Sequence, residues 1–357
     1  MRQKASHSLS AKTLRTITAA VFCLVLVLAA VLFSTWLQKP EENKTTLSTF
    51  AMGSLVQQTV YGNDAEAAAT AASSSVTQLE NKISWRVEGS DIQALNAAAG
   101  HQDVSLSDET AGVLALLLDV CRESRGAFDI TIAPLSLLWN FDEDPALPSA
   151  EDILYFRQYV GYENVSISQG GRRAHLDLEE CAVDLGAAGK GAACDAAIEA
   201  YKAYSVTHAV IAVGGSVGLY GTKPDGSDWN IEIRDPNNDG ALGVLHLVGG
   251  FISTSGSYEK YFEENGVVYH HILDPETGYP AESGLVSVTI VADSGALSDA
   301  LSTACIVLGD DESLSLLEHY GAEAVFVTEQ NEIFVTEGLT ERFELSAAGY
   351  SLVSGLA

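Results

Sequence analysis

The sequence predicts an α+β protein with mixed or antiparallel sheets and packed helices, arranged as two interleaved subdomains and preceded by one N-terminal transmembrane helix. Helical segments and β-like runs do not alternate strictly along the chain, which argues against a doubly wound parallel sheet. One long apolar run lies near the N-terminus. The rest of the chain, about 310 residues, is long enough for one large domain or two small ones.

Three segments have the composition or period of helices. Asp64–Lys82 is rich in alanine, Ser107–Ser124 is amphipathic, and Ala187–Tyr204 is opened by a group of glycines. The expected strands are Ala209–Val213, Trp229–Arg234, Val244–Ser253, Val267–Leu273 and Leu285–Ala292. Glycine turns separate several of these runs, as expected for connections between strands.

The apolar run determines the expected compartment. Thr16–Gln38 contains no charged residue and is long enough to span a bilayer as a helix. Basic residues precede it, which predicts a cytoplasmic N-terminus and an extracytoplasmic body. We therefore expect a basic segment over 1–15, an anchor over 16–38, a linker over 39–49, a folded domain over 50–345 and a tail over 346–357. A cleaved signal peptide is the alternative, but its apolar core is normally shorter.

Charge and cysteine content exclude several function classes. The chain has 48 acidic and 19 basic residues, for a net charge of -29. Such an acidic body repels phosphate backbones, so we expect no nucleic-acid partner. The five cysteines show no CxxC or Cys/His metal spacing, and buried free thiols are expected rather than disulfides.

Asp299 and Thr303 lie one helical turn apart within the apolar segment Ser298–Leu308. At this spacing the two side chains share one face of a helix. A carboxylate and a hydroxyl are hard oxygen ligands of the kind that Mg²⁺ prefers. The alternative is that Asp299 interacts with the helix dipole and that Thr303 bonds to its own backbone.

The segment VDLGAAGKGAACD, residues 183–195, combines glycines with a lysine at the start of a predicted helix. Glycines let a ligand approach the backbone, and Lys190 can meet a phosphate beside the exposed N–H groups of the helix. Asp184 ends the strand-like run before them, a usual place for a ligand contact. The alternative is a plain strand-to-helix turn with a surface lysine.

Two further segments carry candidate residues. In GAFDITIAPLSLLW, a flat aromatic ligand could contact Ala127, Phe128 and Asp129, but the segment by itself favours a core phenylalanine followed by a turn at Pro134. In HHILDPETGYP, His271 is a candidate base or phosphate contact. If this segment is extended, His270 points to the opposite face. The alternative is a surface histidine pair beside a turn.

Together and in this order, six segments resemble the ApbE family of FAD:protein FMN transferases over about residues 50–340. The segments are AMGSLVQQTVYG, ISWRVEGSDIQALN, GAFDITIAPLSLLW, VDLGAAGKGAACD, TSGSYEKYF with HHILDPETGYP, and SDALSTACIVLG. The resemblance implies that FAD is the substrate and that FMN is transferred to a threonine or serine of another protein, with release of AMP.

The resemblance also implies roles for individual residues. Asp299, Thr303 and the carbonyl of Ala187 are expected to bind Mg²⁺. His271 is expected to assist deprotonation of the acceptor hydroxyl, and Lys190 to neutralise phosphate. The residues expected to contact FAD are Met52, Trp85, Ala127, Phe128, Asp129, Asp184, Lys190 and His271. The residues that depart from the usual family pattern are Gly189, Ser216, Ser257 and His270.

The expected partner follows from the same resemblance. It implies an extracytoplasmic flavoprotein acceptor that belongs to an electron-transfer system. With the apolar run, it predicts a single-pass protein of the cell membrane whose catalytic domain lies outside the cytoplasm. Two alternatives stay open at this point: a Mg²⁺-dependent FAD pyrophosphatase that yields FMN and AMP, and a non-catalytic flavin-binding or adhesive surface protein.

Overall fold

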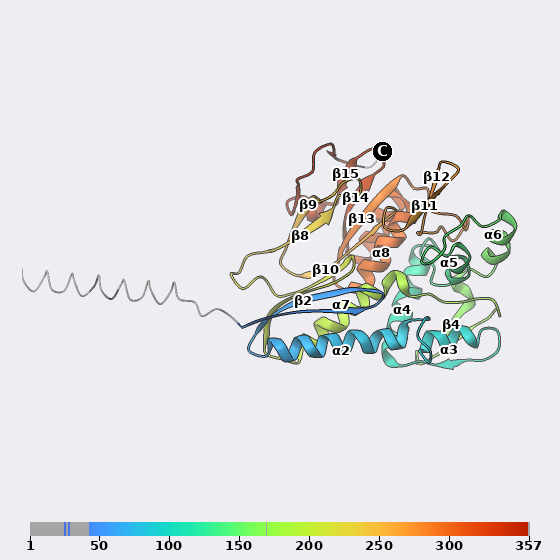
Figure 1. Ribbon diagram of the computed structural model, residues 1–357, viewed down its shortest axis with the longest axis horizontal. Coiled ribbons are helices and arrows are strands. Elements are labelled where there is room, and N and C mark those ends of the chain that lie inside the picture. The colour runs from blue at the N-terminus through green and yellow to red at the C-terminus, as the bar shows by residue number, and fades with distance from the viewer. Residues whose placement is uncertain (1–24, 26–27, 29–42, 169, 356–357) are drawn as a thin grey trace, which may run out of the picture. The chain divides into compact units, whose positions relative to one another are not determined.

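The computed structural model describes Val25, Leu28 and residues 43–168 and 170–355. From Asn43 onward the described chain forms one compact unit around a nine-stranded sheet (Figure 1). The predicted division into two interleaved subdomains is therefore wrong for this part of the chain. The reason is that hydrogen bonding across the nine strands is continuous, so one sheet connects the separate clusters of buried side chains.

The large sheet is almost entirely antiparallel. Its strands lie in the order β1 (Lys44–Ala51), β2 (Ser54–Gly62), β6 (Val206–Val213), β7 (Ser216–Tyr220), β10 (Gly250–Gly256), β13 (Leu285–Ala292), β14 (Glu323–Thr328), β15 (Glu332–Val335) and β17 (Ser351–Val353). Only β15 and β17 pair in parallel. The predicted α+β class with mixed or antiparallel sheets is confirmed.

Smaller elements surround this sheet. Three small sheets contain β3 (Val104–Ser105), β5 (Arg173–Leu176) and β4 (Val165–Ile167); β16 (Phe343–Leu345), β9 (Ala241–Leu247) and β8 (Trp229–Arg234); and β11 (Tyr261–Glu264) with β12 (Val267–His270). The helices are α2 (Ala65–Ile83), α3 (Asp91–Ala97), α4 (Asp108–Glu123), α5 (Ala133–Trp139), α6 (Ala150–Arg157), α7 (Gly186–Lys202), α8 (Gly295–Leu308) and α9 (Asp310–Tyr320). Two short 3₁₀ turns are η1 (Tyr162–Asn164) and η2 (Glu337–Leu339).

Helices α2 and α7 pack on β2 and β6 through small side chains. Ala68 and Ala72 of α2 and Ala193 and Ala197 of α7 are fully buried in the same cluster as Ile211. Because alanine lets a helix axis approach a sheet closely, α7 is held against β6 and β7 of the large sheet. This contact positions the first turn of α7, which carries several of the predicted site residues.

The predicted helices agree with the structure within one or two residues. Asp64–Lys82, Ser107–Ser124 and Ala187–Tyr204 correspond to α2, α4 and α7. The Ser107 side chain accepts a hydrogen bond from the Thr110 N–H and so caps α4. This capping satisfies a backbone donor that the first turn leaves without a partner.

Several sequence boundaries differ from the structure, and the strand expected over Val267–Leu273 ends at His270. The single strand expected over Val244–Ser253 is wrong, because glycines at 249 and 250 divide it into β9, in a small sheet, and β10, in the large one. Strand β1 begins at Lys44, inside the predicted linker 39–49, because β2 supplies a hydrogen-bonding partner that its polar residues do not reveal. The predicted tail 346–357 contains β17, which pairs with β15.

The predicted segments 1–15 and 16–38 lie outside the described residues, apart from Val25 and Leu28. Within the described part of the chain, no helix combines the length and apolar character needed to cross a membrane. The predicted anchor therefore stays a prediction.

Candidate functional site

Helices α7 and α8 cross at two glycines. A Cβ on Gly191 would lie 1.9 Å from the carbonyl oxygen of Gly295, and a Cβ on Gly295 would lie 2.1 Å from that of Gly191. No other residue type fits either position without moving a helix. The crossing brings the first turn of α7, with Ala187 and Lys190, against the middle of α8, with Asp299.

Asp195 of α7 fixes the start of α8. Its carboxylate accepts hydrogen bonds from the Gly295 N–H at 2.8 Å, the Ala296 N–H at 2.8 Å and the Ser294 hydroxyl at 3.1 Å. A carboxylate at a helix N-terminus accepts hydrogen bonds from backbone N–H groups that have no partner within the helix, and the positive end of the helix dipole stabilises its negative charge. Burial still raises the pKa of Asp195 above its ordinary value.

Asp299 is the buried carboxylate at this crossing. It is 3 % exposed, and its Oδ2 accepts a hydrogen bond from the Gly191 N–H at 2.9 Å. The Lys190 Nζ lies 3.8 Å from its Oδ1. Burial raises the pKa of Asp299, although the charge of Lys190 and the bond from Gly191 act in the opposite direction. A cation bound beside Asp299 would favour its ionised form.

Thr303 contacts the neighbouring strand. Its Oγ1 lies 3.2 Å from the hydroxyl oxygen of Ser255 in β10, which is 2.7 Å from that of Ser302. The hydroxyl of Thr303 thus faces β10, on the same side of α8 as Asp299. The two residues expected to share one helix face are therefore brought to one place.

These residues supply oxygen donors of the kind that Mg²⁺ binds. In a regular helix the Gly191 N–H would donate to the Ala187 carbonyl, whereas here it donates to Asp299, so the two oxygens compete for one donor. A carbonyl, a carboxylate and a hydroxyl, completed by water or phosphate, suit Mg²⁺. Among the described residues, no group of three or more His, Cys, Asp or Glu could hold a metal ion, so the candidate set relies on a single carboxylate.

The Lys190 side chain runs past a tight turn between β6 and β7. Gly214 in this turn has a φ of 55°, and a Cβ there would lie 3.1 Å from Lys190 Cδ and 2.8 Å from Ser54 Oγ. Glycine is therefore needed both for the backbone conformation and for the space. The turn holds the lysine ammonium group near Asp299.

His271 follows β12 and is largely enclosed. Its backbone N–H donates to the Lys260 carbonyl at 3.0 Å, and its Nδ1 is buried with no hydrogen-bond partner among the described residues. Burial, followed by the charges of Lys260, His270 and Lys190, lowers the pKa of His271 to about 4. The imidazole is thus neutral at physiological pH and offers a free nitrogen. His270 instead has its Nε2 3.0 Å from the Ala281 carbonyl oxygen.

Asp184 and Trp85 lie together at the start of α7. The Asp184 Oδ1 accepts from the Gly186 N–H at 2.7 Å, and the carboxylate also bonds to the Trp85 side chain. Burial raises the pKa of Asp184 above its ordinary value. The guanidinium of Arg86 lies 4.4 Å from the centre of the Trp85 ring.

Met52 lies in the tight turn of the β1–β2 hairpin. It has a φ of 55° and Gly53 a φ of 63°, as a two-residue turn of this kind requires. The Met52 N–H donates to Glu80 Oε1 at 2.8 Å, which ties the turn to α2. The half-buried Met52 packs against two core clusters, one under β2 and one under α8.

The segment Ala127–Asp129 serves mainly the protein's own packing. Phe128 is a core residue, 4 % exposed. Asp129 accepts from the backbone and hydroxyl of Thr131 and from the Tyr162 N–H at 2.8 Å, so both carboxylate oxygens have partners. The predicted contact of Phe128 and Asp129 with a flavin stays a prediction, and in this structure both side chains are engaged within the protein. Ala127 is half-buried, and its contact with a ligand stays a prediction.

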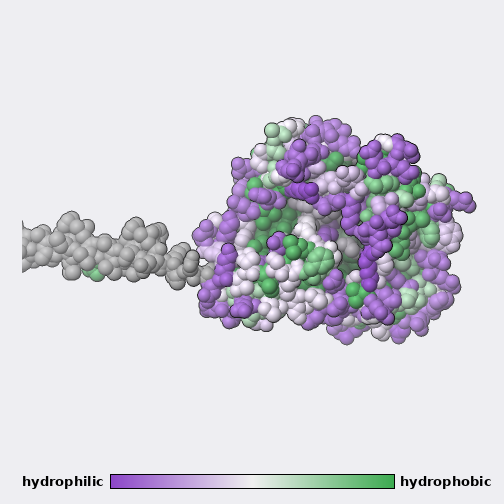
Figure 2. Space-filling view, in the orientation of Figure 1, coloured by the Kyte–Doolittle hydropathy of each residue, from purple (hydrophilic) through white to green (hydrophobic). Residues whose placement is uncertain are grey.

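Three serines to which the sequence analysis assigned no role complete the site. Ser216 bonds through its side chain to Asp299, and its hydroxyl accepts from the Ser253 hydroxyl at 3.0 Å. Ser253 also lies 2.8 Å from the Ser298 hydroxyl. The serines of the TSG segment were visible in the sequence, but their partners lie on other elements. In the view of Figure 2, the face that is drawn is hollowed near its centre.

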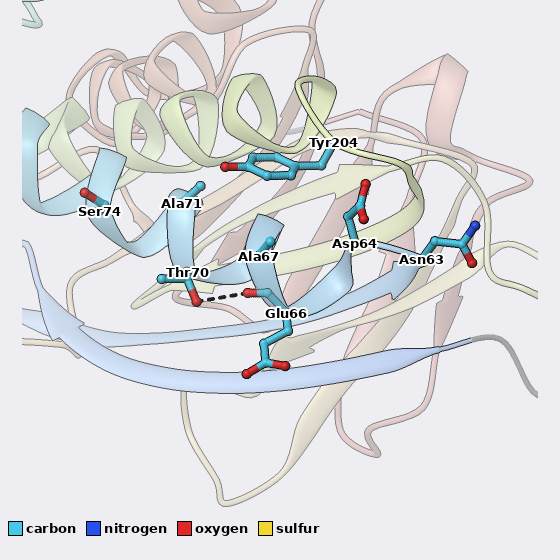
Figure 3. Close-up of a pocket in the computed structure, with 8 residues that line it drawn as sticks. All are labelled: Asn63, Asp64, Glu66, Ala67, Thr70, Ala71, Ser74 and Tyr204. Carbon is cyan, nitrogen blue, oxygen red and sulfur yellow. Dashed lines mark hydrogen bonds between the residues drawn. The ribbon is translucent and has the colours of Figure 1, made fainter.

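A separate groove of about 630 Å³ lies elsewhere on the protein. Figure 3 shows its lining, which comes from the start of α2 and from Tyr204 after α7. None of the predicted site residues lines it. The groove is therefore distinct from the site at the α7–α8 crossing.

Comparison with known proteins places the chain among flavin transferases. Residues 52–326 match the model of the ApbE family. The chain is 29% identical over 332 residues to the FAD:protein FMN transferase of Escherichia coli K12, covering 88% of this chain and 95% of that protein. It is 32% identical over 294 residues to the FAD:protein FMN transferase of Treponema pallidum, covering 77% of this chain and 81% of that protein.

Solved structures agree with this likeness. The ApbE protein of Thermotoga maritima superimposes with a TM-score of 0.78 and 32% identity, covering 84% of this chain and 99% of that one. The apo form of the flavinyl transferase ApbE of Pseudomonas stutzeri superimposes with a TM-score of 0.75 and 30% identity, covering 86% and 98%.

Proposed function

Because the chain belongs to the ApbE family, we propose that it transfers FMN from FAD to a threonine or serine of an acceptor protein and releases AMP. The observation that carries the proposal is the α7–α8 crossing, where the Lys190 ammonium group lies 3.8 Å from the buried Asp299, one helical turn before Thr303. A lysine, a carboxylate and a hydroxyl placed together suit a dinucleotide phosphate and the metal ion that accompanies it.

We assign the metal site to Asp299, Thr303 and the carbonyl of Ala187. When bound there, Mg²⁺ offsets the charge of the FAD pyrophosphate. Lys190 contributes a second positive charge, and its place against the Gly214 turn limits where that charge can lie. Such neutralisation matters in a chain of net charge -29, which otherwise repels an anionic substrate.

His271 is the proposed base for the acceptor hydroxyl. Its Nδ1 has no partner among the described residues and its lowered pKa keeps it neutral, so it can accept a proton. The acceptor oxygen forms a bond to the FMN phosphorus while the bond to the AMP oxygen breaks, and AMP leaves with the bond's electron pair. The proton of the acceptor hydroxyl goes to His271.

The compartment and the acceptor follow from the sequence rather than from the fold. The apolar run 16–38 would anchor the chain in the cell membrane with its catalytic domain outside the cytoplasm. The acceptor would then be an extracytoplasmic flavoprotein of an electron-transfer system, and no nucleic acid would take part.

The test compares cells that produce the wild-type chain, Asp299→Asn or Asp293→Asn. Asp293 is an exposed carboxylate just before α8 and serves as the control. Covalent flavin on extracytoplasmic proteins is read by in-gel fluorescence and located by mass spectrometry. We expect an FMN adduct on threonine or serine with the wild type and the control, and none with Asp299→Asn. An adduct at the wild-type level in Asp299→Asn would refute the assigned metal site.

A second measurement separates transfer from hydrolysis. The purified full-length chain is incubated with FAD and Mg²⁺ without acceptor, and AMP is quantified. Slow release of AMP agrees with a transferase that waits for its acceptor. Rapid, repeated release would instead assign the chain to the FAD pyrophosphatases, and tight FAD binding without any AMP would leave a non-catalytic flavin-binding protein.

A further inference from the structure

Two cations and one carboxylate form a cluster beside the site. Asp142 Oδ1 lies 2.5 Å from Lys260 Nζ, and its Oδ2 pairs with a guanidinium nitrogen of Arg86. The three residues come from the α2–α3 connection, the α5–α6 connection and the residue before β11. The side chains of Arg86 and Lys260 are each 54 % exposed, so both remain accessible from solvent.

This cluster adjoins residues already placed at the site. Lys260 accepts the backbone hydrogen bond of His271, and its charge is among the causes that lower the pKa of that histidine. Arg86 stacks on Trp85, which bonds to Asp184 at the start of α7. The charge of Lys190 also lowers the pKa of His271. Three cations thus border one region of a strongly acidic protein.

We propose that Arg86 and Lys260 bind the phosphates of FAD. In the absence of FAD, the Asp142 carboxylate occupies the position that these phosphates take between the two cations. This inference rests on the proposed function, because it takes FAD as the ligand. A carboxylate whose two oxygens contact two different cations occupies the position that two phosphate oxygens would take. An incoming pyrophosphate displaces Asp142, and the released carboxylate is then repelled by it.

In this assignment Arg86 and Lys260 raise the affinity of the protein for FAD and take no part in the transfer of FMN. A half-exposed ion pair contributes little to folding, since solvent screens it and two long side chains must be ordered. The pyrophosphate of FAD carries two negative charges and more acceptor oxygens than Asp142, so the two cations bind it in preference to the carboxylate. Lys260 and Arg86 are binding residues in this assignment, whereas Asp142 competes with the substrate.

The experiment measures binding of FAD and of riboflavin to the purified full-length chain by flavin fluorescence. EDTA is present, so that no turnover occurs and no metal contributes. Riboflavin carries the flavin ring but no phosphate. For Lys260→Gln we expect the Kd for FAD to rise about tenfold and its salt dependence to weaken, with the Kd for riboflavin unchanged. Arg86→Gln should act in the same direction.

Asp142→Asn tests the place-holding role. This variant keeps the shape of the side chain but removes its charge, and we expect the Kd for FAD to fall about threefold as competition is lost. Arg122→Gln is the matched control, because Arg122 forms an exposed ion pair with Asp119 on α4, and it should change neither Kd.

Several outcomes would overturn the assignment. Equal effects of Lys260→Gln on FAD and riboflavin, or no effect on either, would mean that the cluster only fastens the β11–β12 hairpin. Weaker FAD binding in Asp142→Asn would reject the place-holding role. If the wild-type chain binds no FAD even after Mg²⁺ is added back, the proposed function and this phosphate contact fail together. If phosphate-selective binding is seen without FMN transfer, the proposed function alone fails.

Discussion

Gly191 and Gly295 bring two helices closer than any side chain would allow. A Cβ on either residue would lie about 2 Å from the carbonyl oxygen of the other, at 1.9 and 2.1 Å. The candidate metal ligands lie on both sides of this contact, with Ala187 on α7 and Asp299 on α8. The geometry of the site therefore depends on the absence of two methyl groups.

Gly191→Ala should damage both the fold and the site. The new Cβ meets backbone atoms that cannot move without shifting a helix, and overpacking of this kind costs about 1–3 kcal/mol or more. Thermal unfolding measures the stability, and Mg²⁺-dependent release of AMP measures the site. We expect a lower melting temperature and a loss of the Mg²⁺-dependent release of AMP.

The control for this prediction is two residues away. A Cβ on Gly189 would meet only Ile83 Cδ1, at an ordinary 3.9 Å. Because alanine has a higher helix propensity than glycine by about 1 kcal/mol, Gly189→Ala should raise the melting temperature. Equal destabilisation by both substitutions would show that the α7–α8 contact is not the cause.

Asp195→Ala should loosen α8 and displace Asp299 with it. Asp195 accepts three hydrogen bonds from the start of α8, at Ser294, Gly295 and Ala296. Loss of a capping side chain costs about 0.5–2 kcal/mol, and the partly buried donors left behind add to this. Chemical denaturation should show a reduced free energy of unfolding. Asp195→Asn retains an acceptor and should fall between the wild type and the alanine variant.

The sequence predicted the elements whose pattern is local. Helix α8 is recognisable from its apolar period, and Asp299 and Thr303 from their spacing within it. Strand β1 escaped prediction because its polar residues, such as Lys44 and Thr45, are stabilised by pairing with β2 rather than by an apolar pattern of their own. The sequence predicts one strand over Val244–Ser253, because periodicity does not indicate which sheet a residue joins.

The sequence predicts individual residues of the site but not the contacts between them. Lys190 and Asp299 were singled out separately, but their contact depends on a helix crossing between residues far apart in the chain. Asp129 matched a motif, yet its partner Tyr162 lies 33 residues away, and only the fold shows that its oxygens are already used. Likewise, no spacing rule connects Asp142 with Lys260, 118 residues later.

Trp139 should hold the β11–β12 hairpin in position. Its Nε1 donates to the Gly278 carbonyl at 2.9 Å, and its ring lies within 6.3 Å of Phe262 and Tyr269 of the hairpin. Trp139→Phe keeps an aromatic ring but leaves the buried carbonyl without this donor, at a cost of about 1–3 kcal/mol. We expect a lower melting temperature and faster hydrogen exchange across residues 261–270, measured by mass spectrometry.

Because Lys260 and His271 lie at the two ends of this hairpin, the same variant should also weaken FAD binding. A variant that loses stability without any change in exchange across the hairpin would contradict this anchoring role.

The low pKa of His271 should shape the pH dependence of both stability and activity. Its pKa is about 4 in the folded chain and about 6.5 when unfolded. Between these values the unfolded chain binds the proton more readily, so folding stability falls as the pH decreases from 6.5 towards 4. His271→Gln removes this group, and the slope of unfolding free energy against pH should decrease by up to about 1.4 kcal/mol per pH unit in that window.

Activity should respond to the same pKa. Since kcat/KM reports the free enzyme, a base with a pKa of about 4 stays deprotonated and kcat/KM should not fall through its titration between pH 7 and 5. The measurement is the initial rate of AMP formation at low FAD concentration, with acceptor present. A decline in kcat/KM centred near pH 6.5, absent from His271→Gln, would show that His271 titrates as an exposed histidine and that the enclosed imidazole is not the resting state.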